Sequence, residues 1–154
     1  MDEQCYCNIR WKSVVKLSVW TLLVGFGLNL VWENAQAFLY DGYGDFVEHF
    51  WICFVAAVID GLVILLLYLL LTLIYQDLYW PRRNRKTRYA VAALIAGVLA
   101  VGFELWALKT GAWEYTPRMP VVPELGIGLS PLVQLVVLPV LTYHITLATV
   151  KAER

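Results

Sequence analysis

Four long apolar runs constrain the fold of this chain more than any other feature. They cover residues 14–40, 50–75, 89–107 and 127–150, and each is long enough to cross a bilayer as a helix. Sixty per cent of the residues are apolar and only 16% are charged, which is unlike the composition of a soluble domain. We therefore predict an all-α protein, a four-span transmembrane helical bundle that forms a single integral-membrane domain over residues 1–154.

The distribution of basic residues predicts how this bundle lies in the membrane. Ten of the twelve lysines and arginines fall in the N-terminal segment, between the second and third runs, or in the C-terminal tail. The other two connections hold only Lys109 and Arg118. Because cytoplasmic loops are enriched in Lys and Arg, we expect both termini in the cytoplasm and a location in the plasma (inner) membrane. The basic cluster at 82–88 then needs only membrane lipid as its partner, and no nucleic acid.

A carboxylate inside the first run is the most informative polar residue of the sequence. Glu33 has Asn29 four positions before it and Gln36 three positions after it. Residues three or four apart share a helix face, so these side chains form one polar stripe. An ionisable group at the centre of a span costs roughly 2.5–3.5 kcal/mol on insertion scales, so its presence indicates a function.

The second and third runs carry acids of the same kind, Asp60 and Glu104, and the fourth carries Gln134. Counted inward from the outer ends of the runs, these residues and Glu33 lie within roughly 10 Å of one level. Carboxyl groups that share an apolar site hinder one another's ionisation, so that one can act as an acid while another acts as a base. We predict that Glu33, Asp60 and Glu104 are catalytic residues.

Aromatic and amide side chains near these acids are candidates for substrate binding, since aromatic rings stabilise a transient cation. The substrate-binding candidates are Asn29, Trp32, Gln36, Phe103, Trp106, Trp113, Tyr115 and Gln134. Interhelical hydrogen bonding is an equally good interpretation of the single amides, and anchoring at the membrane surface is an alternative for the tryptophans. His144 lies near the inner end of its run, and we place it outside the site.

Other features predict local structure. Gly25 and Gly27 indicate close helix packing, and the small residues around Glu104 indicate a face directed into the bundle. Residues 110–123 contain three prolines and two aromatics, which fits either an ordered lid or an aromatic anchor on the membrane surface. Residues 41–45 predict a solvated turn. Pro131 and Pro139 both predict a bend in the last span.

Two short segments resemble known families. Asn29-Leu-Val-Trp-Glu33 resembles the N-x-x-W-E segment of the integral-membrane terpene cyclases of meroterpenoid pathways. The segment from Glu104 through Thr110-Gly to Tyr115 resembles the E…TG…Y segment of the membrane carotenoid hydratases. Both families add a proton to an isoprenoid inside the membrane. The resemblance therefore implies Glu33 and Glu104 as candidate acids.

The sequence thus predicts an integral-membrane enzyme that performs acid/base chemistry (cyclisation, hydration or isomerisation) on a lipid-soluble isoprenoid. Glu33 or Glu104 would donate a proton, and Asp60 would remove one or activate water. No motif requires a cofactor, and Cys5 and Cys7 without partner histidines indicate no metal site. The alternatives are a non-catalytic subunit that binds a pigment, a quinone or a partner helix, and a proton or solute carrier. A homo-oligomer is compatible with either class.

Overall fold

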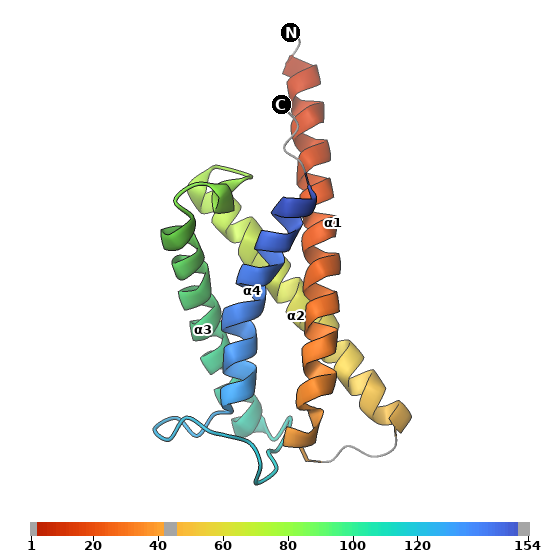
Figure 1. Ribbon diagram of the computed structural model, residues 1–154, viewed down its shortest axis with the longest axis vertical. Coiled ribbons are helices and arrows are strands. Elements are labelled where there is room, and N and C mark those ends of the chain that lie inside the picture. Colours follow the sequence, from red (N-terminus) through yellow and green to blue (C-terminus); the bar gives the residue numbers. More distant parts are fainter. Residues whose placement is uncertain (1–2, 42–45, 151–154) are drawn as a thin grey trace.

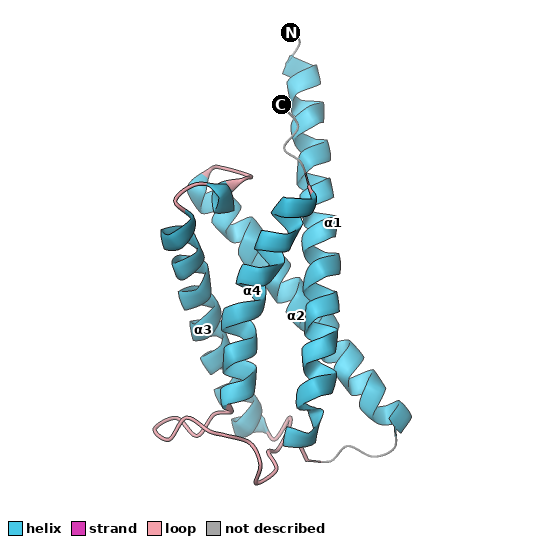
Figure 2. Cartoon of the chain, viewed as in Figure 1, coloured by secondary structure: helices cyan, strands magenta, loops and turns pink. Residues whose placement is uncertain are grey.

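The computed structural model describes residues 3–41 and 46–150 and consists mainly of four long helices (Figures 1 and 2). These helices are α1 (Glu3–Gln36), α2 (Phe46–Tyr75), α3 (Arg85–Thr110) and α4 (Leu129–Thr149), with two short 3-10 turns, η1 (Ala37–Leu39) and η2 (Trp80–Arg82). All four are long and apolar enough to cross a membrane. The predicted all-α membrane bundle is confirmed. Most of the predicted turn at 41–45 and the tail at 151–154 lie outside the described residues.

The helices run up and down, so that the connections gather at two ends (Figure 1). The start of α1, the end of α4 and the connection 76–84 lie at one end, which we call the basic end. The end of α1, the start of α2 and residues 111–128, which we call the outer loop, lie at the other. The first half of α2 diverges from α3, because α2 runs obliquely behind α1 and α4.

Two glycines permit the close crossing of α1 and α2. A methyl group added to Gly61 would lie 3.2 Å from the backbone nitrogen of Phe26, and one added to Gly25 would lie 3.6 Å from the Cα of Gly61. Close backbone approach at small residues is the usual way in which helices associate in membranes. The prediction for Gly25 is supported, whereas Gly27 has no neighbour within 4 Å of such a methyl group.

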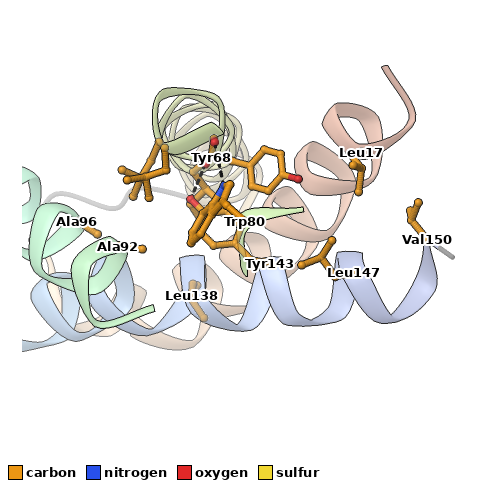
Figure 3. Close-up of a cluster of buried hydrophobic side chains, with 12 residues drawn as sticks. Leu17, Tyr68, Trp80, Ala92, Ala96, Leu138, Tyr143, Leu147 and Val150 are labelled. Carbon is orange, nitrogen blue, oxygen red and sulfur yellow. Dashed lines mark hydrogen bonds between the residues drawn. The ribbon is translucent and has the colours of Figure 1, made fainter. Parts of the chain in front are cut away.

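The basic end is filled by a buried aromatic cluster (Figure 3). The side chains of Tyr68, Trp80 and Tyr143 are fully buried, and the Trp80 ring lies 5.5 Å from that of Tyr143. Each polar tip has a partner: Tyr143 donates to the carbonyl of Ile64 at 2.8 Å, for example. Trp80, which follows the second apolar run, is a core residue because η2 turns it into the bundle.

The basic cluster at 82–88 also has a structural role beyond setting the topology. Arg82 donates to the carbonyls of Leu147 and Val150 at the end of α4, at 2.9 and 3.1 Å. Arg88 donates to the carbonyl of Trp80 and lies over the ring of Tyr75. Cations at the end of a helix satisfy its last carbonyls and interact favourably with its dipole.

The remaining helix features follow from local chemistry. The buried face of α3 consists of alanines and Glu104, as the spacing of small residues predicts. The helix ends at Gly111, whose positive φ of 67° supplies a left-handed cap. Pro139 lies in the interior of α4. Pro131 lies in the first turn of the helix, where its missing N–H would have no intrahelical partner, so it removes no hydrogen bond of the helix.

Replacement of Gly61 by alanine should destabilise the bundle by about 1–3 kcal/mol, because the new methyl group would press on the backbone of α1. The measurement is the free energy of unfolding in mixed micelles of detergent and SDS. Gly27→Ala is the matched control, since its methyl group meets open space. Equal stabilities for the two variants would contradict the close crossing.

Candidate functional site in the bundle cavity

A cavity of about 730 Å³ lies between the helices on the loop side of the Gly61 crossing. Its volume is within the range of roughly 300–1,000 Å³ that is usual for small-molecule sites. Most of its wall is apolar, and Glu33, Asp60, Glu104, Gln36 and Gln134 supply its polar groups. All three acids that the sequence singled out therefore line one cavity. The other lining residues are Tyr40, Trp51, Ile52, Val55, Ala56, Ile59, Ala100, Phe103, Trp106, Ala112, Trp113, Pro131 and Leu135.

The amide of Gln134, in the second turn of α4, is the centre of the polar groups. Its Nε2 lies within hydrogen-bonding distance of Asn29 Oδ1 at 2.9 Å, Glu33 Oε1 at 2.6 Å and Asp60 Oδ2 at 2.8 Å. Gln134 is 2% exposed, so these contacts exclude water. One side chain thus joins α1, α2 and α4 at a single level. We call Asn29, Glu33, Asp60 and Gln134 the polar hub.

Gln36 closes the hub on its loop side. Its Nε2 donates to Gln134 Oε1 at 2.8 Å and to Glu33 Oε1 at 3.1 Å. Its Oε1 accepts from Ser130 Oγ at 2.7 Å and from Trp32 Nε1 at 3.1 Å. Every donor and acceptor position of this amide is used, which fixes the orientation of Gln36 and, through it, that of Gln134.

Glu33 and Asp60 form a carboxyl pair at the amide of Gln134. The Nε2 atom of Gln134 lies 2.6 Å from Glu33 Oε1 and 2.8 Å from Asp60 Oδ2, so the two carboxyl groups meet at one nitrogen. Two carboxylates that share a buried site repel each other, and a proton on one of them removes this repulsion. The same nitrogen has two hydrogens for three acceptors, of which Asn29 is the third. The geometry therefore favours a pair that holds one proton between its two carboxyl groups.

Glu104 lies on the same cavity but has a different partner. Its carboxylate accepts a hydrogen bond from the phenol of Tyr115, and the backbone N–H of Gly128 donates to the same phenol oxygen at 2.9 Å. Tyr115 thus links α3 to the residue just before α4. Burial, followed by the hydrogen bond to Glu104, raises the pKa of Tyr115 to about 12. The phenol therefore stays protonated at neutral pH.

The outer loop closes the cavity toward the loop end of the bundle. It is pinned to the end of α1 by bonds from Asp41 N to Glu114 O and from Thr116 N to Leu39 O, both 2.9 Å. The rings of Trp113 and Tyr115 pack edge-on against Tyr40. Of the two interpretations of residues 110–123, an ordered lid fits this arrangement.

The structure divides the predicted binding residues into two groups. Gln36, Phe103, Trp106, Trp113 and Gln134 line the cavity with the acids. Asn29, Trp32 and Tyr115 do not line it; each instead hydrogen-bonds to a residue that does. His144 lies near the basic end, where its Nδ1 is 3.1 Å from Nη2 of Arg85. In the described part of the chain, no three His, Cys, Asp or Glu side chains lie close enough to hold a metal ion.

Sequence reasoning missed several residues of the site. Ser130, which bonds to Gln36, stands four positions before Gln134, and this helical spacing is a signal that could have found it. Tyr40 and Trp51 also line the cavity, and both lie near the ends of spans, where aromatic residues are common as interfacial anchors. No local signal distinguishes those two roles.

Comparison of the chain with protein-family models, with curated proteins and with solved structures finds no match. The functional argument therefore depends on the geometry of the cavity.

Replacement of Gln134 by leucine should lower the free energy of unfolding by about 1–3 kcal/mol, because it leaves the buried hub without its common partner. Titration with SDS measures the change. Asn34→Leu is the control, since Asn34 is exposed and bonds only to its own helix at Leu30. The hub would not be the structural centre of the site if both substitutions had the same small effect.

The raised pKa of Tyr115 predicts a loss of stability at high pH. Its pKa rises from the ordinary value of 10.0 to about 12 on folding, so the folded state holds the phenolic proton more tightly. This contribution to stability is complete below pH 10 and is lost as the pH rises to about 12. The free energy of unfolding should therefore fall more steeply in the wild type than in Tyr115→Phe over this interval. Parallel curves for the two proteins would contradict the assignment.

Proposed function

We propose that this chain is an integral-membrane enzyme of the plasma (inner) membrane that performs acid/base chemistry on a lipid-soluble isoprenoid. The observation that carries the proposal is that Glu33, Asp60 and Glu104 line one apolar cavity at membrane depth. Acids inside spans are costly and by default functional, and an apolar cavity with a few converging polar groups is the usual form of a small-molecule site.

The division of roles follows from the hydrogen bonds. The Glu33–Asp60 pair meets at the amide of Gln134 and holds one proton between its two carboxyl groups, so it is the group that can give a proton to an epoxide oxygen or a double bond of the substrate. Glu104, which accepts from Tyr115, is the group that can take a proton from the resulting cation or from an attacking water. Between the two steps, the cation would be stabilised by ring faces that line the cavity, including those of Phe103 and Trp106.

The walls of the cavity support an apolar substrate that enters from the bilayer. Trp51, Val55 and Ile59 on α2 and Trp106 on α3 line the cavity, and each is more than half exposed. All four lie within membrane-spanning helices. Exposed apolar side chains at that depth face lipid, so the side of the cavity between α2 and α3 is its route of access. The reacting end of the substrate would reach the acids while its apolar chain stays in the bilayer.

A non-catalytic subunit that binds a quinone or a pigment is the second candidate. The observation that favours it is Gln36, whose four hydrogen bonds all go to other side chains of the protein. A side chain whose hydrogen-bonding groups are all used within the protein is typical of a residue that joins helices rather than of a catalytic residue. A pigment that copurifies with the protein, together with full stability of the amide variants of the acids, would favour this candidate.

The test of the enzyme proposal is turnover of isoprenoid epoxides by the protein reconstituted in lipid. Glu33→Gln, Asp60→Asn and Glu104→Gln should each lower the rate by about 10²–10⁴-fold, since each removes an acid or a base. Glu124→Gln, an exposed acid of the outer loop, is the matched control and should leave the rate unchanged. Thermal melting of each variant separates loss of chemistry from loss of fold. Wild-type turnover in all three variants would refute the mechanism.

A further inference from the structure

The direction of the hydrogen bonds in the site is set by two groups that have only one possible role. The indole N–H of Trp32 can only donate, and it donates to Oε1 of Gln36 at 3.1 Å. The carbonyl of Gly25 can only accept, and it accepts from Nδ2 of Asn29 at 2.7 Å. Between these two ends lie the amides of Gln36, Gln134 and Asn29. Each amide could otherwise present either its oxygen or its nitrogen to a neighbour.

The two ends impose the same direction on the amides between them. Oε1 of Gln36 accepts from Trp32 and, at 2.7 Å, from Ser130, so its Nε2 is turned toward the hub. That nitrogen donates to Oε1 of Gln134 at 2.8 Å, which leaves Nε2 of Gln134 facing the acids. From the other end, Oδ1 of Asn29 accepts from the same Nε2 at 2.9 Å. The two glutamines therefore present N–H groups, and not oxygens, to the acid pair.

These N–H groups are divided unequally between the two acids. Oε1 of Glu33 accepts from both amides, at 2.6 Å from Gln134 and at 3.1 Å from Gln36. Within the described part of the chain, Asp60 accepts one bond, from Gln134 at 2.8 Å, and shares that nitrogen with Glu33. A hydrogen bond that is donated to a carboxylate favours its ionised form. The donors therefore favour the charge on Glu33, which leaves the proton of the pair to Asp60.

The burial of the two side chains fits this division. Glu33 is 9% exposed, and a charge at such a position must be compensated by hydrogen bonds, which the two glutamines supply. Asp60 is less completely buried and lines the cavity from α2. A neutral carboxyl group at this place requires fewer donors, and it can itself donate its O–H to a ligand in the cavity.

We propose that Asp60 holds the proton of the acid pair in the resting protein. Trp32 and Ser130 are the positioning residues that keep it there, because they hold the nitrogen of Gln36 on the other acid. The role of this proton in turnover rests on the proposed function. When Asp60 gives the proton to a substrate oxygen, its O–H bond breaks, the electron pair stays on Asp60, and the substrate takes the positive charge. Asp60, which the sequence predicted as the base, is then the acid of the site.

The experiment is infrared spectroscopy of the full chain in lipid, after cell-free synthesis with labelled amino acids. The carbonyl stretch of a protonated carboxyl group moves to lower frequency when its carbon is carbon-13. A Glu104→Gln background removes any band of the third acid. Carbon-13 in the aspartate carboxyl groups should then shift the whole band, and Asp60→Asn should abolish this shift. A band that moves with labelled glutamate, or the absence of any such band, would overturn the proposal.

The positioning role has a measurement of its own. Trp32→Phe combined with Ser130→Ala leaves Oε1 of Gln36 without these donors, so the amide can turn. Glu33 then loses one of its two donors, and part of the band should move with labelled glutamate. Ser130→Thr, which keeps the hydroxyl group, is the matched control and should give the wild-type pattern. A proton that stays wholly on Asp60 in the double variant would overturn the positioning role.

Failure of this proposal is distinguishable from failure of the proposed function, because the infrared band is read from the resting protein without a substrate. A band that follows labelled aspartate in a protein that turns over no isoprenoid would keep the assignment and refute the enzyme. Turnover by a protein whose band follows labelled glutamate would do the reverse.

Discussion

The structure depends on one buried amide. At membrane depth no water is available to a polar side chain, so each such group must find a partner inside the protein. Gln134 meets this need for Asn29, Glu33 and Asp60 together and thereby joins three of the four helices. The close packing of α1 against α2 at Gly25 and Gly61 supports this hub, because it brings Asp60 to the level of Glu33. Hydrogen bonding and close packing thus specify the same arrangement.

The bundle is built differently on the two sides of the hub. Toward the basic end, aromatic rings and alanines fill the interior, and arginines satisfy the last carbonyls of α4. Toward the loop end, α2 diverges from α3, and residues of all four helices and of the outer loop line the cavity there. A well-packed end gives the rigidity that a site needs, while the divergent end gives room for a ligand.

The polar groups of the cavity form two separate units. Glu33 and Asp60 share their environment with Gln134, whereas Glu104 is held by Tyr115, which the outer loop supplies. Glu104 nevertheless lines the same cavity as Glu33 and Asp60. Carboxyl groups with unlike partners around one cavity can hold protons with different strength, which is the condition for acid and base work in a single site.

The sequence alone determined the number of the spans, the polar stripe of Asn29, Glu33 and Gln36, and the common depth of the acids. These follow from hydropathy and from the helical period, which are local properties. Only the tertiary structure decided that Glu33 shares Gln134 with Asp60 while Glu104 bonds to Tyr115, that Asn29 supports the hub from outside the cavity, and that Trp80 is buried. The reason is that helix rotation and crossing depend on contacts between distant residues, such as Gly61 against Phe26, which no local pattern contains.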